Sequence, residues 1–333
     1  MSKVPFDTLS PEQRENVRSA LAAAFGSAAI DAITPITGGA STASTFRLDA
    51  GGRRYLLRVE GKPSPLRNPH QYASMRIAAE AGIAPDIHYI DEVARVAVID
   101  FIDQQPLKTY PGGPRALAQA LGELLSRVQS TPVFPTFVNY PDIVARLFAH
   151  VRRTGLFAAG LLDAHVERLE RLHQAYDAGL TNLVSSHNDP IPSNILFDGK
   201  RLWLIDWESA YRNDPLVDVA IVLDSLALSP ELANVLLRAW LGRAPDEAVR
   251  ARLEPIHALT RLYYAGVLLS ASAAASWVTG DTDFSAPTLQ QFRLAIHEGR
   301  LKPGAPGTKH ILGKMFLASF FSGVAPPGFD DAV

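Results

Sequence analysis

The stretch from 185 to 211, SSHNDPIPSNILFDGKRLWLIDWESAY, sets acidic and amide side chains among residues typical of a buried core. Burying a polar group without a partner costs free energy, so strands made for burial rarely carry many of them. The polar members of this stretch therefore need a reason, and they are His187, Asp189, Asn194 and Asp206.

Two short apolar runs in this stretch predict a β-hairpin. The runs ILF at 195–197 and RLWLI at 201–205 flank the turn sequence Asp-Gly at 198–199. A hairpin brings the start of one strand beside the end of the other, so Asn194 and Asp206 are expected to face each other. A carboxylate and an amide oxygen at close range suit a magnesium ion.

Each polar residue also has an ordinary structural explanation. Asp189 before Pro190 is a common turn former, Asp206 can cap the segment that follows it, and Asn194 can satisfy loop backbone. Their combination, in this order and on one hairpin, favours a functional interpretation over three separate structural ones. In that interpretation Asp189 orients or deprotonates a hydroxyl group.

Length and composition limit the class of protein. A chain of 333 residues exceeds what one hydrophobic core usually supports, so two lobes are expected. A net charge of −2 gives no electrostatic reason to expect nucleic acid or an anionic membrane as partner. The absence of cysteine excludes disulfides, thiolate catalysis and cysteine-bound zinc, and it suits the reducing cytosol. We expect a cytoplasmic protein, and nothing in the sequence indicates its oligomeric state.

The order of strand and helix patterns predicts an α+β fold. Residues 33–60 alternate β-branched and apolar residues between glycine pairs, as antiparallel hairpins do, and short strand patterns recur at 86–90 and 95–103. Between them, 70–81 has the pattern of one helix. From Arg115 onward the apolar spacing is mainly helical. We expect a small N-terminal lobe at 1–103 and a larger helical lobe at 104–333.

Two segments bear on membrane association. The first 26 residues predict a capped amphipathic helix and lack the continuous apolar core of a signal peptide. The stretch 262–280 carries no charged residue and is close to bilayer-spanning length. Its serine, alanine and glycine content makes it only mildly apolar, so we predict a buried helix and no membrane insertion.

The motifs HNDPIPSNIL and LIDWESA resemble the HxDxxxxN catalytic loop and the metal-binding aspartate of the aminoglycoside phosphotransferase and choline kinase family. This family shares the bilobal protein-kinase fold, and the motifs are closest to those of choline, ethanolamine and thiamine kinases. The resemblance implies that Asp189 is the catalytic base, that His187 supports the catalytic loop, and that Asn194 and Asp206 bind the magnesium ion of ATP. Such a site performs phosphoryl transfer mainly by positioning and charge neutralisation.

In the first lobe, the resemblance implies three nucleotide contacts, each with a simpler alternative. The segment TGGASTASTF resembles a phosphate-covering loop, although a plain hairpin turn fits it too. A basic residue in YLLRV stands where the family binds phosphate, or is an edge-strand charge. The segment VAVIDFIDQQPL resembles the lobe hinge whose backbone meets adenine, or a buried strand entering a linker. The residues implied are Gly39, Ser41, Thr42, Arg58, Asp100, Phe101 and Ile102.

One position departs from the family pattern, and another matches it. Where the family places a glutamate near the start of the helix, this sequence has Gln71, and Glu80 is too late in the helix to replace it. We therefore expect either an amide contact to Arg58 and a weaker charge clamp, or a different helix register. The segment RNDPLVDVAIVLD resembles the one whose aspartate anchors the catalytic loop, here Asp218, although an acid at a helix N-terminus is equally common.

The resemblance predicts a small-molecule kinase whose acceptor is a cationic amino alcohol such as choline or ethanolamine. Aromatic rings can cage a quaternary ammonium group, and a neighbouring carboxylate adds attraction. Packing in the core is the simpler role for each ring taken singly. An aminoglycoside phosphotransferase and a catalytically silent nucleotide-binding protein are the alternatives. The candidate acceptor residues are Trp207 and Glu208, with Tyr211, Tyr263, Tyr264 and Trp277 nearby in the helical lobe.

Overall fold

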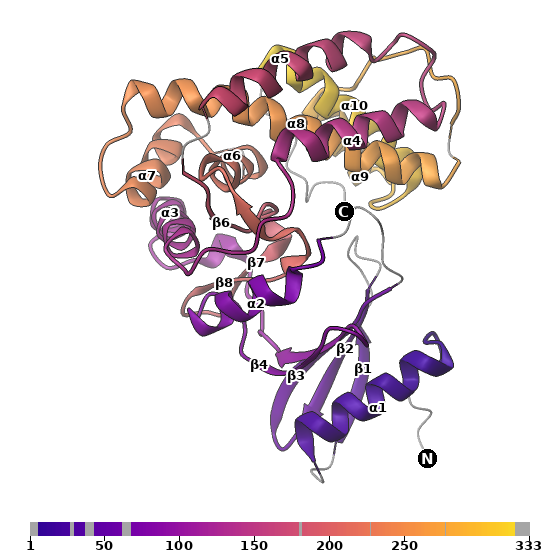
Figure 1. The fold of residues 1–333 in the computed structure, drawn as a ribbon, viewed down its shortest axis with the longest axis vertical. Coiled ribbons are helices and arrows are strands. Elements are labelled where there is room, and N and C mark those ends of the chain that lie inside the picture. The colour runs from indigo at the N-terminus through magenta and orange to yellow at the C-terminus, as the bar shows by residue number, and fades with distance from the viewer. Residues whose placement is uncertain are drawn as a thin grey trace.

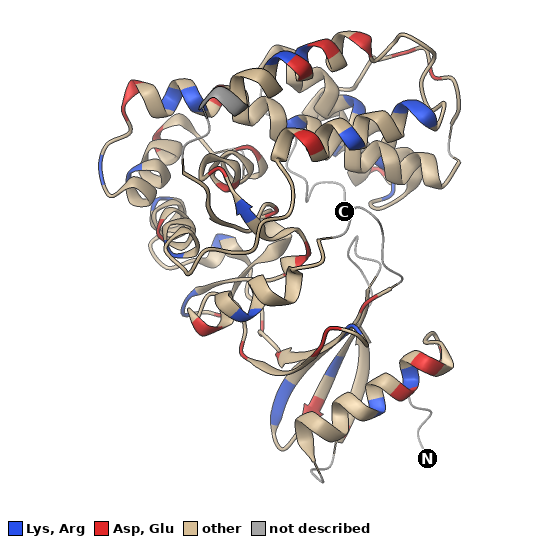
Figure 2. Ribbon diagram, viewed as in Figure 1, with Lys and Arg blue, Asp and Glu red and all other residues tan. Residues whose placement is uncertain are grey.

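The computed structural model describes residues 6–26, 30–36, 43–61, 68–179, 182–226, 228–276 and 278–323. A small sheet-containing lobe and a larger, mainly helical lobe are stacked along the long axis of the molecule (Figure 1). This mixed α+β architecture confirms the predicted fold class. Lys and Arg are interspersed with Asp and Glu over the described part of both lobes (Figure 2).

The small lobe is built on a five-stranded antiparallel sheet with the order β1-β2-β3-β5-β4. The predicted hairpin at 51–52 is present, and both glycines have positive φ (58° and 73°), as a tight turn between twisted strands requires. Helix α1 (Pro11–Phe25) begins at a Ser10 capping box and lies along the sheet (Figure 1). The strands are β1 (Ile30–Ile36), β2 (Ser44–Ala50), β3 (Arg53–Val59), β4 (Ile87–Asp91) and β5 (Val96–Asp100).

Each lobe has its own core. The inward-facing alternate residues of β2, β3 and β5 pack with α1 in the small cluster, among them Phe46, Leu48 and Leu57. Helix α2 (Gln71–Glu80), which falls within the predicted first lobe, contributes Ala78 to the large cluster. Its start is also tied to the large lobe, because Asn68 Nδ2 and Ser74 Oγ donate hydrogen bonds of 2.6 and 2.8 Å to the carbonyl of Ala210.

The large lobe surrounds two small β-ladders with helices. Close approach of helices is made possible by glycine: a Cβ at Gly122 would overlap the Leu236 carbonyl where α3 meets α7, and one at Gly313 would lie 2.7 Å from Leu269 where α10 meets α8. The helices are α3 (Gly113–Gln129), α4 (Tyr140–Arg153), α5 (Asp163–Gly179), α6 (Leu216–Ser225), α7 (Pro230–Leu241), α8 (Glu247–Ala274), α9 (Leu289–His297) and α10 (Pro306–Ser322), with the 3-10 turn η1 (Leu107–Thr109) between the lobes.

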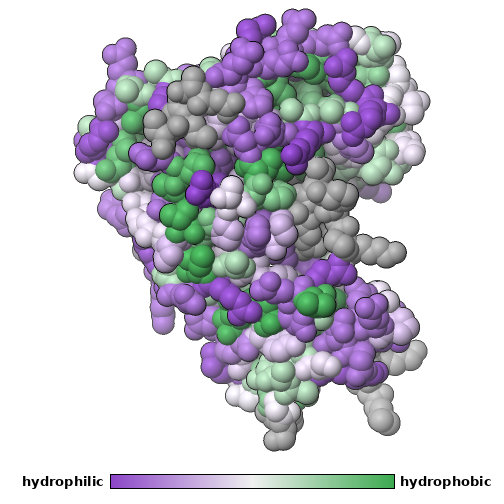
Figure 3. Space-filling model, viewed as in Figure 1, coloured by the Kyte–Doolittle hydropathy of each residue, from purple (hydrophilic) through white to green (hydrophobic). Residues whose placement is uncertain are grey.

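The uncharged stretch after Leu262 forms the second half of α8, where Leu262, Ala265 and Leu269 are fully buried in the large core. The predicted buried helix is therefore confirmed as far as Ala274. Among the residues that the structure describes, no helix is both long and apolar enough to span a membrane. The face seen in Figure 3 is largely hydrophilic, with apolar residues gathered toward the middle of the molecule.

Candidate active site

The hairpin predicted from the opening stretch is present and defines one wall of the site. Strands β7 (Ile195–Phe197) and β8 (Leu202–Leu204) pair with Ile195 opposite Leu204. The ladder continues one step further, where the N–H of Ile205 donates a 3.0 Å hydrogen bond to the carbonyl of Asn194. Asp206 is the next residue, so the hairpin brings Asn194 and Asp206 together as the register predicted.

Asp206 has an unusual backbone. Its φ of 64° and ψ of 67° are left-handed, a conformation that costs a non-glycine residue roughly 1–2 kcal/mol. The residue directly precedes the 3-10 turn η3 (Trp207–Ser209), and its side chain is 20% exposed. Backbone strain of this kind persists only where the surroundings hold it, and it redirects the carboxylate at the end of β8 into the space between the lobes.

Asp189 lies on the loop between β6 (Val184–Ser186) and the 3-10 turn η2 (Pro192–Asn194). Its Oδ1 accepts a 2.6 Å hydrogen bond from the hydroxyl of Tyr264, and its Oδ2 accepts one of 2.9 Å from Nδ2 of Asn194. Burial raises the pKa of Asp189 to about 8; these two hydrogen bonds oppose the rise, and the negative charge of Asp206 adds to it. A carboxyl group that titrates near neutral pH suits a proton acceptor.

The amide of Asn194 is fixed by the same contact. Its Nδ2 donates to both the carbonyl and the carboxylate of Asp189, each at 2.9 Å. Because both partners are acceptors, the nitrogen of the amide must point toward Asp189, and the amide oxygen points away from it. That oxygen is the atom a hard cation would bind.

Asp218 anchors the loop that carries Asp189. Its carboxylate accepts the backbone N–H groups of His187 (2.8 Å) and Asn188 (2.7 Å), the contact expected from the sequence. Asn188 has a positive φ of 62°, and its buried side chain bonds the carbonyl of Ser209 and Nδ2 of Asn213. Strand β9 (Tyr211–Asn213), which supplies Asn213, pairs with β6 and completes the support.

His187 is completely buried, which restricts it to a structural role in the loop. Burial lowers the pKa of His187 and outweighs the attraction of Asp218, so the imidazole is neutral. Its Nε2 lies 2.8 Å from the carbonyl of Ile205, an acceptor, and therefore carries the proton. This bond ties the loop that carries His187 and Asp189 to the end of β8, one residue before Asp206.

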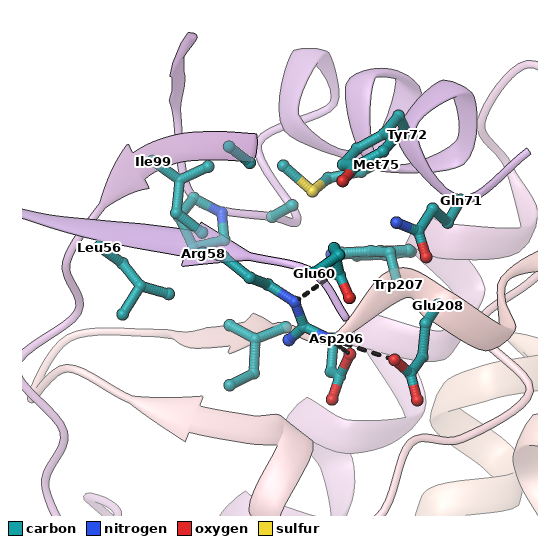
Figure 4. Close-up of a pocket in the computed structure, with 14 residues that line it drawn as sticks. Leu56, Arg58, Glu60, Gln71, Tyr72, Met75, Ile99, Asp206, Trp207 and Glu208 are labelled. Atoms are coloured by element: carbon teal, nitrogen blue, oxygen red, sulfur yellow. Dashed lines mark hydrogen bonds and ion pairs between the residues drawn. The ribbon is translucent and has the colours of Figure 1, made fainter. Parts of the chain in front are cut away.

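Arg58, on β3 of the small lobe, meets three carboxylates (Figure 4). Its Nε lies 2.6 Å from Glu60, and its Nη2 lies 2.9 Å from Asp206 and 3.2 Å from Glu208. Burial alone lowers the pKa of the guanidinium, but the carboxylates, Asp206 first, outweigh burial and raise the pKa above its ordinary value. Arg58 thus stays charged and links the two lobes.

The motif resemblance pointed to Gln71 as the partner of Arg58, and the sequence did not reveal Glu60 in this role. Gln71 does line the pocket beside Arg58, whereas Glu80 is exposed at the far end of α2. The signal that could have found Glu60 is its spacing: residues two apart on a strand point to the same face, so Arg58 and Glu60 are neighbours. An acid that is 3% exposed needs a partner, and Arg58 is that partner.

The pocket around Arg58 lies between the two lobes. Its apolar side includes Leu56, Ala97 and Ile99 of the sheet and Ile205 of the large lobe, and its charged side is formed by Glu60, Asp206 and Glu208. A flat apolar slot that ends in a cation and hard oxygen atoms has the chemistry of a nucleotide site.

The hinge segment follows β5 as expected. The N–H of Asp100 donates to the carbonyl of Asp86 (2.9 Å), and the N–H of Phe101 donates to that of Arg54 (3.1 Å). Both groups are therefore engaged within the protein, so neither of these two backbone donors is directed at a ligand in this structure. The carboxylate of Asp100 lies 2.7 Å from Nε2 of His88 and 3.3 Å from Nη2 of Arg53.

The aromatic residues proposed for the acceptor have different environments. Trp207 is 4% exposed and packs against His187 and Phe134, as a core residue does. Tyr263 and Tyr264 of α8 form an edge-on pair beside Asp189, while Glu208 is 43% exposed next to them in the cleft. Tyr211 packs edge-on against Phe137. Gly39, Ser41, Thr42 and Trp277 lie outside the described residues.

The donor set fits a magnesium ion. Asp206, which lines the pocket, and the amide oxygen of Asn194, which the hairpin places close by, are hard oxygen donors of the kind this ion prefers. No cluster of three histidine, cysteine or acidic side chains suited to a metal occurs in the described ranges, so a zinc-type centre finds no support there.

Comparison with known proteins assigns the class. Residues 32–256 match the model of the phosphotransferase enzyme family, and the chain belongs to this family. A curated relative, protein LicA of Haemophilus influenzae, is 23% identical over 211 residues, which is 62% of this chain and 62% of LicA. The matched region thus spans somewhat less than two thirds of that relative.

Solved structures share the fold. A choline/ethanolamine kinase family protein from Mesorhizobium loti aligns with a TM-score of 0.59 and 24% identity over 91% of this chain and 99% of that one. LicA in complex with AMP aligns with a TM-score of 0.63 and 14% identity over 92% and 96%. A spectinomycin phosphotransferase in complex with ADP and spectinomycin aligns with 0.53 and 14% over 79% and 87%. The protein is a member of the phosphotransferase enzyme family and has the bilobal fold that these kinase structures share.

Proposed function

We propose that this protein transfers the γ-phosphate of magnesium-bound ATP to the hydroxyl group of a small cationic amino alcohol such as choline or ethanolamine. The observation that carries the proposal is the placement of Asp189. Its carboxylate is held by Asn194 on one side and by Tyr264 of α8 on the other, beside Asp206. A proton acceptor thus stands where the nucleotide end of the cleft meets the helical lobe.

The two lobes contribute different parts of the proposed site. Residues 1–103 contribute the apolar slot for adenine and Arg58 for the phosphates, and 104–333 contribute the catalytic loop and the acceptor site. Asn194 and Asp206 would hold magnesium, which neutralises phosphate charge when it is bound. Asp189 accepts the proton of the acceptor hydroxyl, and Asp218 and His187 keep the loop in place. We expect the reaction to take place in the cytoplasm.

The acceptor is proposed from the side chains next to Asp189. Tyr263 offers a partly buried ring, whereas Tyr264 is 6% exposed and packs in the core, and Glu208 adds a carboxylate that is partly exposed in the cleft. Rings and a carboxylate together attract an alkylated ammonium group by cation–π contact and by charge. The M. loti structure carries the name choline/ethanolamine kinase family protein, which supports the same class of acceptor.

An antibiotic phosphotransferase is the second candidate, because a spectinomycin phosphotransferase shares the fold. An aminoglycoside carries several positive charges and would need several carboxylates around the acceptor. A silent nucleotide-binding protein is less well supported, since Asp189, Asn194 and Asp206 are all present and in contact through one loop and hairpin.

Release of ADP from magnesium ATP, measured with choline, ethanolamine, thiamine, sugars and aminoglycosides, tests these proposals. Asp189→Ala is the blank, and Asp163→Ala, an exposed acid of α5, is the matched control. Turnover with choline or ethanolamine that is lost only in Asp189→Ala supports the proposal, with nucleotide binding retained in that variant. Turnover with aminoglycosides alone would replace the amino alcohol by the antibiotic class.

A further inference from the structure

Glu60 follows β3 and is held firmly in its position. Its N–H donates to the carbonyl of Arg95 at 3.0 Å, and its own carbonyl accepts from Nε2 of Gln13 in α1 at 3.5 Å. The side chain is 3% exposed, and its Oε1 lies 2.6 Å from Nε of Arg58. The backbone bonds to Arg95 and Gln13 hold Glu60 in place, and the ion pair holds its carboxylate against the guanidinium of Arg58.

The other two partners of Arg58 differ from Glu60 in a way that matters for function. Asp206 and Glu208 belong to the large lobe, are 20% and 43% exposed, and face the cleft where cation and phosphates are proposed to bind. When the cation and the phosphates are bound, Asp206 and Glu208 interact with them as well as with Arg58. Glu60 belongs to the same lobe as Arg58 and lies 3% exposed in the wall of the pocket, so its ion pair with Arg58 does not depend on how the two lobes are placed.

The uncharged residue at position 71 explains why Arg58 needs a carboxylate from outside α2. Gln71 is the first residue of α2, is 6% exposed, and points into the same pocket as Glu60 (Figure 4). An amide at this position adds no negative charge for Arg58. A guanidinium with only 18% of its side chain exposed needs a permanent counter-charge, since an unpaired buried charge is costly.

We propose that Glu60 is the positioning residue of Arg58: it supplies from the end of β3 the carboxylate that the start of α2 lacks, and it aims Arg58 at the nucleotide phosphates. This inference rests on the proposed function, because the phosphates are the target of Arg58. The ion pair that positions Arg58 then lies within one lobe and does not depend on the position of α2.

The test moves a carboxylate from position 60 to position 71 by substitution. Glu60→Gln keeps the shape of the side chain and removes its charge, and we expect affinity for magnesium ATP to fall roughly 10- to 100-fold, the range for losing a hydrogen bond to a charged group. Adding Gln71→Glu to this variant is expected to recover most of the loss. Glu80→Gln, at the exposed end of α2, is the control and keeps the wild-type affinity.

The measurement is calorimetric binding of magnesium ATP without acceptor, together with the Michaelis constant for ATP wherever an acceptor has been found. Undiminished affinity in Glu60→Gln, or a double variant no better than the single one, would overturn the proposal. If Glu60→Gln does not fold, Glu60→Asp is used, and unchanged affinity there would overturn it equally. Failure of the unmodified protein to bind the nucleotide would instead refute the proposed function.

Discussion

The hydroxyl of Tyr264 donates a 2.6 Å hydrogen bond to Oδ1 of Asp189, which joins the long helix α8 to the catalytic loop. The opposite oxygen of the carboxylate accepts from Asn194. Both oxygen atoms of the proposed base are thus oriented before any ligand binds. The neighbours of Tyr264 are Tyr263 and Phe316, whose rings hold its own ring in place.

Removing the hydroxyl of Tyr264 should change how activity depends on pH. A base works when it is ionised, so activity rises with pH through the pKa of Asp189, which is about 8 in the free protein. A hydrogen bond to the charged carboxylate lowers this pKa. In Tyr264→Phe the pKa of Asp189 is therefore higher, and we expect the rise in kcat/KM for the acceptor to move to higher pH.

The control for this change is Tyr140→Phe. Tyr140 is also fully buried in the large lobe, and its hydroxyl has no hydrogen-bond partner among the described residues. Removing the hydroxyl of Tyr140 should leave the dependence of kcat/KM on pH unchanged. An unshifted profile in Tyr264→Phe would show that the hydrogen bond does not tune the base.

Neutralising Asp189 should stabilise the protein. A carboxyl group whose pKa is raised from 3.8 to about 8 by burial destabilises the folded state above pH 4, and the penalty grows until the pH exceeds 8. We therefore expect Asp189→Asn to raise the melting temperature, more at pH 8 than at pH 5, by roughly 2–4 °C for each kcal/mol gained. An equal effect at both pH values in thermal denaturation would contradict the raised pKa.

Replacing Asp206 should weaken nucleotide binding only when magnesium is present. The carboxylate is a proposed ligand of the ion, and it also pairs with Arg58 at 2.9 Å. We expect Asp206→Ala to lose most of the increase in ATP affinity that magnesium provides to the unmodified protein. Calorimetric titration with and without magnesium measures this, and an undiminished increase would remove Asp206 from the ligand set.

Truncating Asp218 should destabilise the protein and disorganise the catalytic loop. Its carboxylate is the partner of two buried N–H groups, those of His187 and Asn188. Leaving a buried donor unsatisfied costs about 1–3 kcal/mol, so Asp218→Ala should lower the free energy of unfolding by at least about 2 kcal/mol. Urea denaturation checks this against the exposed-acid control Asp163→Ala. A change below experimental error would mean that water replaces the carboxylate.

Features that depend on neighbours in the chain could be predicted from the sequence. The hairpin around 198–199 and the strands at 44–59 follow from alternation and turn residues, which act over a few positions. The same locality brings Asn194 next to Asp206, because the register of a short hairpin leaves no alternative. The order of polar residues in the opening stretch was sufficient to predict the kind of chemistry.

Contacts between distant segments could not be predicted in this way. The sequence predicted either an amide contact from Gln71 to Arg58 or a different helix register, and it did not reveal that the carboxylate of Glu60 meets Arg58 or that α2 contributes Ala78 to the large core. Similarly, the aromatic candidate Tyr264 was noted for its ring, and only the structure placed its hydroxyl on Asp189.

The sequence by itself determined the strands of the small sheet, the hairpin at 195–204 and the family to which the chain belongs, because each depends on residues close together in the chain. The tertiary structure decided which carboxylates surround Arg58, which oxygen atoms orient Asp189, and which lobe holds α2. The physical reason is that these contacts depend on how two separate cores pack against each other. That packing is the sum of many weak contacts across the whole chain, and no short motif encodes it.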